Sequence, residues 1–254
     1  MSARTQLRLL SPLAIPLALG VLAAPLAAGH EAASRPFAVA ELFVELNDTD
    51  SDLGLHAAID GGTWTNLVIE GPRERLLLGI GAQGRLLSQG LTQLAFESAE
   101  PTFEELDPAD FFRRFPEGVY EIEALAQGGG TLESRVRLSH VLAAPARATV
   151  SGQAAAESCD ATPLPEVSSP VLIDWDPVTS SHPEIGKTGP VTISRYQFFV
   201  EKGATKLSLD LPPTVTEFEI PAGITAAGGQ FKFEIIARTS TGNNTAMESC
   251  FRVR

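Results

Sequence analysis

Short stretches in which every second residue is apolar recur along this chain, and turns that contain glycine or proline separate them. The stretches 40–46, 216–220 and 231–237 alternate most clearly. Because successive side chains of a β-strand point to opposite faces of the sheet, this period predicts strands with one buried face. The 22 glycines and 18 prolines have the density expected of a chain of strands and turns. The sequence therefore predicts an all-β fold.

The alternating stretches fall into two groups, which predict two tandem β-sandwich domains at 37–147 and 165–254. Small residues and prolines between the groups predict a linker over 148–164. In the first domain, Asp107 before Pro108 predicts the start of a short helix. The strands expected there cover 40–46, 55–59, 64–70, 75–80, 91–96, 118–124 and 132–138. Those expected in the second domain cover 171–177, which ends in a proline turn, and 193–201, 216–220, 231–237 and 246–253.

Three segments of the second domain carry a family resemblance. They read I-D-W-D-P, G-P-V-T-I-S-R-Y-Q-F-F-V-E and F-K-F-E-I-I-A-R-T-S-T-G-N. Over residues 165–254 the chain resembles a fibronectin type III domain, with these segments as strands B, C and F. The resemblance implies that Trp175 and Tyr196 pack in the core. Phe231 stands where that family usually has a corner tyrosine, so it keeps the aromatic ring and lacks the hydroxyl.

The first domain repeats this order of features around Tyr120. A glycine, the tyrosine, an alternating strand, a turn and a last strand follow one another, as they do near the end of the chain. This order predicts an immunoglobulin-like domain with Tyr120 as its corner tyrosine. With the stretches E-L-F-V-E-L-N-D-T-D and F-F-R-R-F-P-E-G-V-Y, the whole chain resembles exported bacterial proteins that pair such a domain with a C-terminal fibronectin-like module.

Residues 1–29 have the composition of a secretory signal peptide. Arg4 and Arg8 precede an uncharged apolar run that ends in small residues. The alternative is a membrane anchor, but three prolines interrupt the run, which is short for a spanning helix. We therefore expect a secreted or periplasmic protein without a membrane span.

The chain has two cysteines, Cys159 and Cys250. Because an exported protein meets an oxidising environment, we predict a disulfide between them. Two buried free thiols are the alternative.

The charge balance narrows the possible partners. Against 31 acidic residues the chain has 19 Lys and Arg, which gives a formal net charge of -12. Nucleic acid and acidic membrane surfaces would be repelled. The partners expected for an exported sandwich protein are a protein or a polysaccharide at the cell surface, contacted through loops.

The acidic segment 47–54 is the sharpest candidate site. Asp48, Asp50 and Asp52 alternate there, at the end of an expected strand. Calcium needs several oxygen ligands from a short segment, so these residues predict a calcium site. The alternative is a solvated acidic turn, because Asn and Asp are common in turns.

Signals for catalysis are few. The chain has no G-x-S-x-G or H-E-x-x-H motif, and its four histidines lack zinc spacing. If cleavage follows Gly29, His30 becomes the N-terminal residue, whose amino group and imidazole can bind copper. A carbohydrate-binding role would need an exposed aromatic platform, for which Trp64 is available because Trp175 has a core role. We therefore predict a non-enzymatic exported protein for recognition, adhesion or spacing, with carbohydrate binding or a copper enzyme as alternatives.

Overall fold

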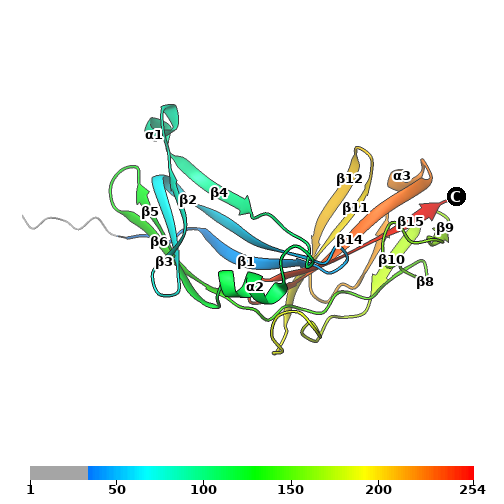
Figure 1. Cartoon of the computed structure of the whole chain (residues 1–254). Helices are drawn as coiled ribbons and strands as arrows, with labels where there is room; N and C mark the ends of the chain where they lie inside the picture. The colour runs from blue at the N-terminus through cyan, green and yellow to red at the C-terminus, as the bar shows by residue number, and fades with distance from the viewer. Residues whose placement is uncertain (1–33) are drawn as a thin grey trace, which may run out of the picture. The chain divides into compact units, whose positions relative to one another are not determined.

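A computed structural model describes residues 34–254, and most of that chain is paired in sheets (Figure 1). In the described part, one eleven-stranded sheet contains the path β12-β11-β14-β15-β1-β2-β5-β6. These strands are β1 (Val39–Asn47), β2 (Asp52–Gly71), β5 (Gly118–Ala126), β6 (Thr131–Leu138), β11 (Ile193–Lys202), β12 (Thr205–Leu211), β14 (Gly229–Thr239) and β15 (Asn244–Val253). Off this path, β3 (Arg75–Gly81) and β4 (Leu91–Glu97) pair with β2, and β9 (Glu166–Val167) pairs with β15. The predicted all-β class is confirmed.

The first buried cluster lies between the strands that surround β2. Most of its residues come from β1, β2, β5 and β6, and burial alternates most regularly along β5. Helix α2 (Pro108–Arg114) adds Phe111 to this cluster. Asp107 caps α2, because its carboxylate accepts a hydrogen bond of 2.7 Å from the Ala109 amide. The predicted helix start is confirmed.

The second buried cluster lies between two sheets. A four-stranded sheet consists of β13 (Glu217–Ile220), β10 (Val171–Trp175), β7 (Ala148–Val150) and β8 (Gln153–Ala154). Its buried side chains, such as Ile173 and Val150, belong to the same cluster as Phe198 of β11 and Phe233 of β14. Two facing sheets that share one core make this part a β-sandwich.

The structure corrects the prediction of separate strands at 55–59 and 64–70. Both belong to β2, which runs through Gly61 and Gly62 without a turn. The two glycines permit close packing there, because a Cβ on Gly61 would lie 2.9 Å from the Phe37 ring. A pair of glycines in a strand sequence therefore marks a close contact here, where sequence reasoning expected a turn.

The segment 148–164 also differs from the expected linker. It begins with β7, which pairs with β10, and Val150 is buried in the second cluster. Sequence reasoning also missed β12 and the short helices α1 (Arg85–Gln89) and α3 (Ala222–Thr225). The two helices are too short to show a helical period, whereas β12 alternates at Leu207, Leu209 and Leu211 and could have been found from this pattern.

The two buried clusters share one sheet through β1 and β15. These strands pair in parallel, with Glu45, Leu46 and Asn47 opposite Asn244, Thr245 and Ala246. The described residues, 34–254, belong to one compact unit. The division into tandem domains therefore stays a prediction. The expected signal peptide and His30 lie outside the described residues. Within the described residues, no helix is long and apolar enough to cross a membrane.

Candidate functional site

One face of the shared sheet points away from both buried clusters, and it holds most of the unusual polar contacts. On β14, Phe233, Ile235 and Ala237 belong to the second cluster, whereas Glu234 and Ile236, which alternate with them, do not. The outward side chains continue across β15, β1 and β2 in register. We call this surface the junction face and define it by Glu41, Phe43, Glu45, Asp52, His56, Glu100, Glu234, Ile236, Arg238, Asn244, Ala246 and Glu248.

A continuous row of charged and aromatic side chains crosses the junction face. Arg238 Nη2 lies 2.8 Å from Glu41 Oε2, and the same guanidinium lies 4.6 Å from the Phe43 ring centroid. The Phe43 ring stacks on His56 at 5.3 Å, and His56 Nε2 lies 2.9 Å from Glu100 Oε1. Because Arg238 is buried, its charge requires these partners. The row holds β14, β1, β2 and the segment after β4 together.

Glycine lets the Glu100 carboxylate reach this face. Gly54 of β2 lies beneath it, and a Cβ at this position would overlap the carboxylate. On the neighbouring strand, Glu45 Oε2 accepts a hydrogen bond of 2.6 Å from Asn244 Nδ2. The absence of a side chain at Gly54 therefore allows two carboxylates to gather above adjacent strands.

Several carboxyl groups of the junction face have raised pKa values. Burial raises the pKa of Glu234 to about 7, and its cross-strand neighbour Glu248 adds to the shift. Burial raises the pKa of Asp52 to about 6, with the Glu100 and Asp50 carboxylates adding to it. Burial also raises the pKa of Glu100. Acidic groups therefore outnumber basic groups on this face.

The structure places the three aspartates of the predicted calcium site in different environments. Asp48 Oδ1 lies 2.8 Å from His182 Nε2, and Asp50 Oδ2 accepts a hydrogen bond of 3.1 Å from Asn47 Nδ2. Asp52 belongs to the junction face. Among residues 34–254, no group of three or more His, Cys, Asp or Glu side chains is placed to hold a metal ion. Calcium binding stays a prediction.

His182 connects the two regions of the chain at a buried position. It lies in the loop between β10 and β11, whereas Asp48 lies in the turn between β1 and β2. The backbone amides of Glu184 and Ile185 donate to His182 Nδ1 at 3.2 and 2.8 Å. Nδ1 therefore accepts, and Nε2 carries the proton that it donates to Asp48. Sequence reasoning missed this contact, because the two residues are 134 positions apart.

Asn243 forms a second buried connection beside the junction face. Its Oδ1 accepts a hydrogen bond of 3.0 Å from the Val44 amide. Its Nδ2 donates to the carbonyl oxygens of Ser139 and Val141, at 2.8 and 3.0 Å. The side chain is 1% exposed. In the sequence, Asn243 looks like an ordinary turn residue, and no local signal distinguishes it.

The predicted disulfide is present between Cys159 and Cys250, whose sulfurs are 2.04 Å apart. It ties the segment after β8 to β15.

The four residues proposed for the core are all buried, namely Tyr120, Trp175, Tyr196 and Phe231. The Tyr120 hydroxyl donates to the Pro116 carbonyl oxygen at 3.0 Å, which is the bond of a corner tyrosine.

Trp64 corrects another expectation. Its side chain is 0% exposed and belongs to the first buried cluster. A buried ring offers no surface on which a sugar could stack. The residue considered for carbohydrate binding is therefore a core residue.

Comparisons with known proteins give weak similarities. No protein-family model matches the chain, and no curated protein matches it. Its structure is similar to that of a 1.5-MDa bacterial ice-binding adhesin, with 11% identity, a TM-score of 0.25, and coverage of 87% of this chain and 66% of that chain. It is also similar to a tetra-tandem repeat in the extending region of a large adhesion protein (11% identity, TM-score 0.27, coverage 85% and 50%). A third similar structure is a Ca2+-stabilised adhesin with which an Antarctic bacterium binds ice (10% identity, TM-score 0.26, coverage 88% and 50%).

This chain thus spans from 50% to 66% of the length of these structures. Because all three TM-scores are below 0.5, the similarities support no conclusion about function.

Proposed function

We propose that this protein acts outside the cytoplasm as a non-enzymatic module for recognition, adhesion or spacing. The observation that carries the proposal is the single sheet shared by two buried clusters through β1 and β15. A flexible linker would let two modules turn independently. A shared sheet with buried hydrogen bonds across it keeps them in one orientation, as a spacer or a bound adhesive module requires.

Two further observations support this role. The disulfide is typical of proteins that work in an oxidising compartment. Asn243 and His182 add buried hydrogen bonds between the regions, so the connection does not depend on β1 and β15 alone. The partner we propose is a protein or polysaccharide at the cell surface, contacted through the partly exposed carboxylates of the junction face.

The rigidity of the connection is tested by residual dipolar couplings of the purified chain with its disulfide intact. We expect the amides of both buried clusters to fit one alignment tensor. Asn243→Ala should worsen that fit, whereas Asn66→Ala, the same change at an exposed position, should leave it unchanged. Thr245→Val is a milder junction variant, because it removes only the hydrogen bond to the Ala143 carbonyl. A wild-type chain that requires two different tensors would contradict the spacer proposal.

The location and partner class are tested on cells that produce the protein. We expect protease added to intact cells to digest it. The purified chain should also bind to isolated cell envelopes. If the partner is a protein, treating the envelopes with protease should reduce this binding; if it is a polysaccharide, periodate should reduce it. A chain that stays protected in intact cells and does not bind envelopes would overturn the recognition role.

A further inference from the structure

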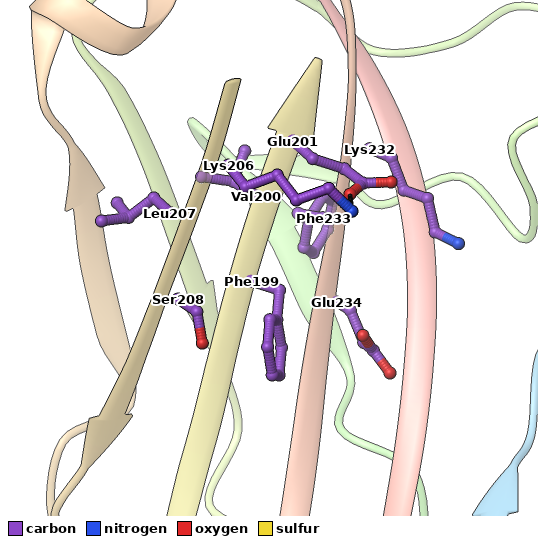
Figure 2. A pocket seen from close by; sticks show the side chains of 9 residues that line it. All are labelled: Phe199, Val200, Glu201, Lys206, Leu207, Ser208, Lys232, Phe233 and Glu234. Carbon is purple, nitrogen blue, oxygen red and sulfur yellow. Dashed lines mark ion pairs between the residues drawn. The ribbon is translucent and has the colours of Figure 1, made fainter. Parts of the chain in front are cut away.

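A pocket beside the junction face combines an aromatic ring with a carboxylate (Figure 2). It opens over β12, β11 and β14 and has a volume of about 280 Å³. Its lining includes Phe199, Glu201, Lys206, Lys232 and Glu234. Small-molecule sites usually occupy roughly 300–1,000 Å³, so this pocket suits a single side chain better than a larger ligand.

The two lysines at the pocket already have partners. Lys206 Nζ lies 2.6 Å from Glu201 Oε2, and Figure 2 shows the Lys206 side chain extending across β11 to that carboxylate. Lys232 forms an ion pair with Glu248. Each of these cations is therefore neutralised by a carboxylate, and neither remains for Glu234.

Glu234 is the carboxylate without a partner. Within residues 34–254 it forms neither an ion pair nor a side-chain hydrogen bond, although most of it is buried. Glu201, Glu248 and Glu45 lie close enough to raise its pKa further, and Lys232 opposes them. The charged groups around Glu234 thus leave a negative excess, which a bound cation would neutralise.

Phe199 supplies the second half of the site. It lies directly opposite Glu234 in the pairing of β11 with β14, and both side chains point to the same side of the sheet in Figure 2. An ammonium group can contact a carboxylate and the face of an aromatic ring together, while its methylene stem packs on apolar surface. A metal ion would need several oxygen ligands, and no such group is found among the described residues.

We propose that this pocket binds the side chain of a lysine on a partner protein, with the ammonium at Glu234 and the stem against Phe199. The proposal rests on the recognition role above and specifies its partner as a protein with an exposed basic segment. The charge of the chain agrees with a basic partner, because acidic residues outnumber Lys and Arg by 31 to 19.

The test is an NMR titration at pH 8. The peptide acetyl-Gly-Lys-Gly-amide is added to the full exported chain, whose disulfide is kept intact. We expect shift changes confined to the amides around Phe199 and Glu234. The same peptide with an acetylated lysine should cause none, because acetylation removes the charge. Glu234→Gln should weaken binding at least tenfold, and Phe199→Leu about threefold, since it keeps apolar contact but removes the ring.

Glu219→Gln is the matched control, because it removes the same charge from an exposed position on the other sheet. We expect it to change the affinity by less than twofold. Binding should also weaken at least tenfold between pH 8 and pH 5.5 in the wild type, and Glu234→Gln should abolish most of that dependence.

Two results would overturn the lysine site. One is equal weakening by Glu234→Gln and Glu219→Gln, which would mean general attraction to an acidic protein. The other is a neutral oligosaccharide that shifts these amides while the lysine peptide does not. In the second case recognition would remain and the partner class would change. Failure of the recognition role itself is separately visible in the envelope-binding experiment.

Discussion

The two buried clusters are built by different means, although one sheet serves both. The first depends on β2, which pairs with β1 over residues 52–60, with β4 over 56–64, and with β3 and β5 over 64–71. The second lies between two separate sheets, and a disulfide ties the segment after β8 to β15 in this part of the chain. The first cluster thus depends on the course of one long strand, and the second on contacts between two sheets, one of which contains the disulfide-bonded strand β15. A substitution that removes a contact specific to one cluster should therefore lower the stability of that cluster more than that of the other.

Removal of the disulfide should have the largest effect on this comparison. Cys159 and Cys250 are 91 positions apart, and closing a loop of that length constrains the unfolded chain by roughly 4–5 kcal/mol in a chain-entropy model. We expect the double variant Cys159→Ser, Cys250→Ser to lose about this much stability in urea unfolding. Hydrogen exchange should show the loss mainly in β10, β13 and β14, with β2 and β5 less affected. Equal loss of protection in both regions would mean that they unfold as one unit.

His182→Ala should have the next largest effect. It leaves the amides of Glu184 and Ile185 and the carboxylate of Asp48 without their partner, so we expect a loss of about 2–4 kcal/mol. His56→Ala is the matched control on the junction face, where the ring makes fewer hydrogen bonds and solvent is closer. We expect it to cost about half as much in thermal or urea unfolding. A larger loss for His56→Ala would place the main connection on the junction face.

Glu234→Gln should change how stability depends on pH. Burial raises the pKa of Glu234 from 4.5 to about 7, so its contribution is intact below pH 4.5 and is lost as the pH rises through 7. The glutamine variant avoids this loss, and we expect it to be about 1–3 kcal/mol more stable than wild type at pH 8. At pH 4.5 the two should be nearly equal in urea unfolding. A gain of the same size at both pH values would exclude ionisation of Glu234 as its cause.

Two tyrosine variants compare a hydrogen bond in each buried cluster. Tyr120→Phe frees the Pro116 carbonyl, and Tyr196→Phe frees the Val178 amide, which donates to the Tyr196 hydroxyl at 2.9 Å. Each change should cost about 1 kcal/mol. We expect the larger loss for Tyr196→Phe, because an unpaired amide is tolerated less well than a carbonyl with a free lone pair. Urea unfolding of both variants measures the order, and a clearly larger loss for Tyr120→Phe would reverse it.

The sequence predicted what depends on local patterns or on few choices. Alternation located the buried faces, such as Phe231 and Phe233, and two cysteines in an exported chain allowed one disulfide. Prediction from the sequence failed where a residue type has two common uses. Gly61 was expected in a turn, but it allows close packing inside β2. The expectation of an exposed ring at Trp64 was wrong for the same reason, because tryptophan is common both in buried cores and on binding surfaces.

The contacts of the junction face could not be predicted, because they join residues far apart in the chain. Asn244 and Glu45 are 199 positions apart, and alternation indicates only that both point away from the core. Which outward charges meet depends on the parallel pairing of β1 with β15, for which the sequence has no local signal. The same pairing brings Glu45 near Glu234, whereas Glu248 lies opposite Glu234 in the antiparallel pairing of β14 with β15.

Calcium should have the smallest effect, and it decides between two interpretations of segment 47–54. Asp48 already bonds to His182 and Asp50 to Asn47, so a metal would have to displace both. We expect the melting temperature to stay the same in excess calcium and in chelator, because a ligand stabilises only a native state that binds it. A rise with calcium that Asp50→Asn abolishes would establish the metal site. It would also mean that the turn beside β1 rearranges and gives up its contact with His182, so the connection between the two clusters would then depend on calcium.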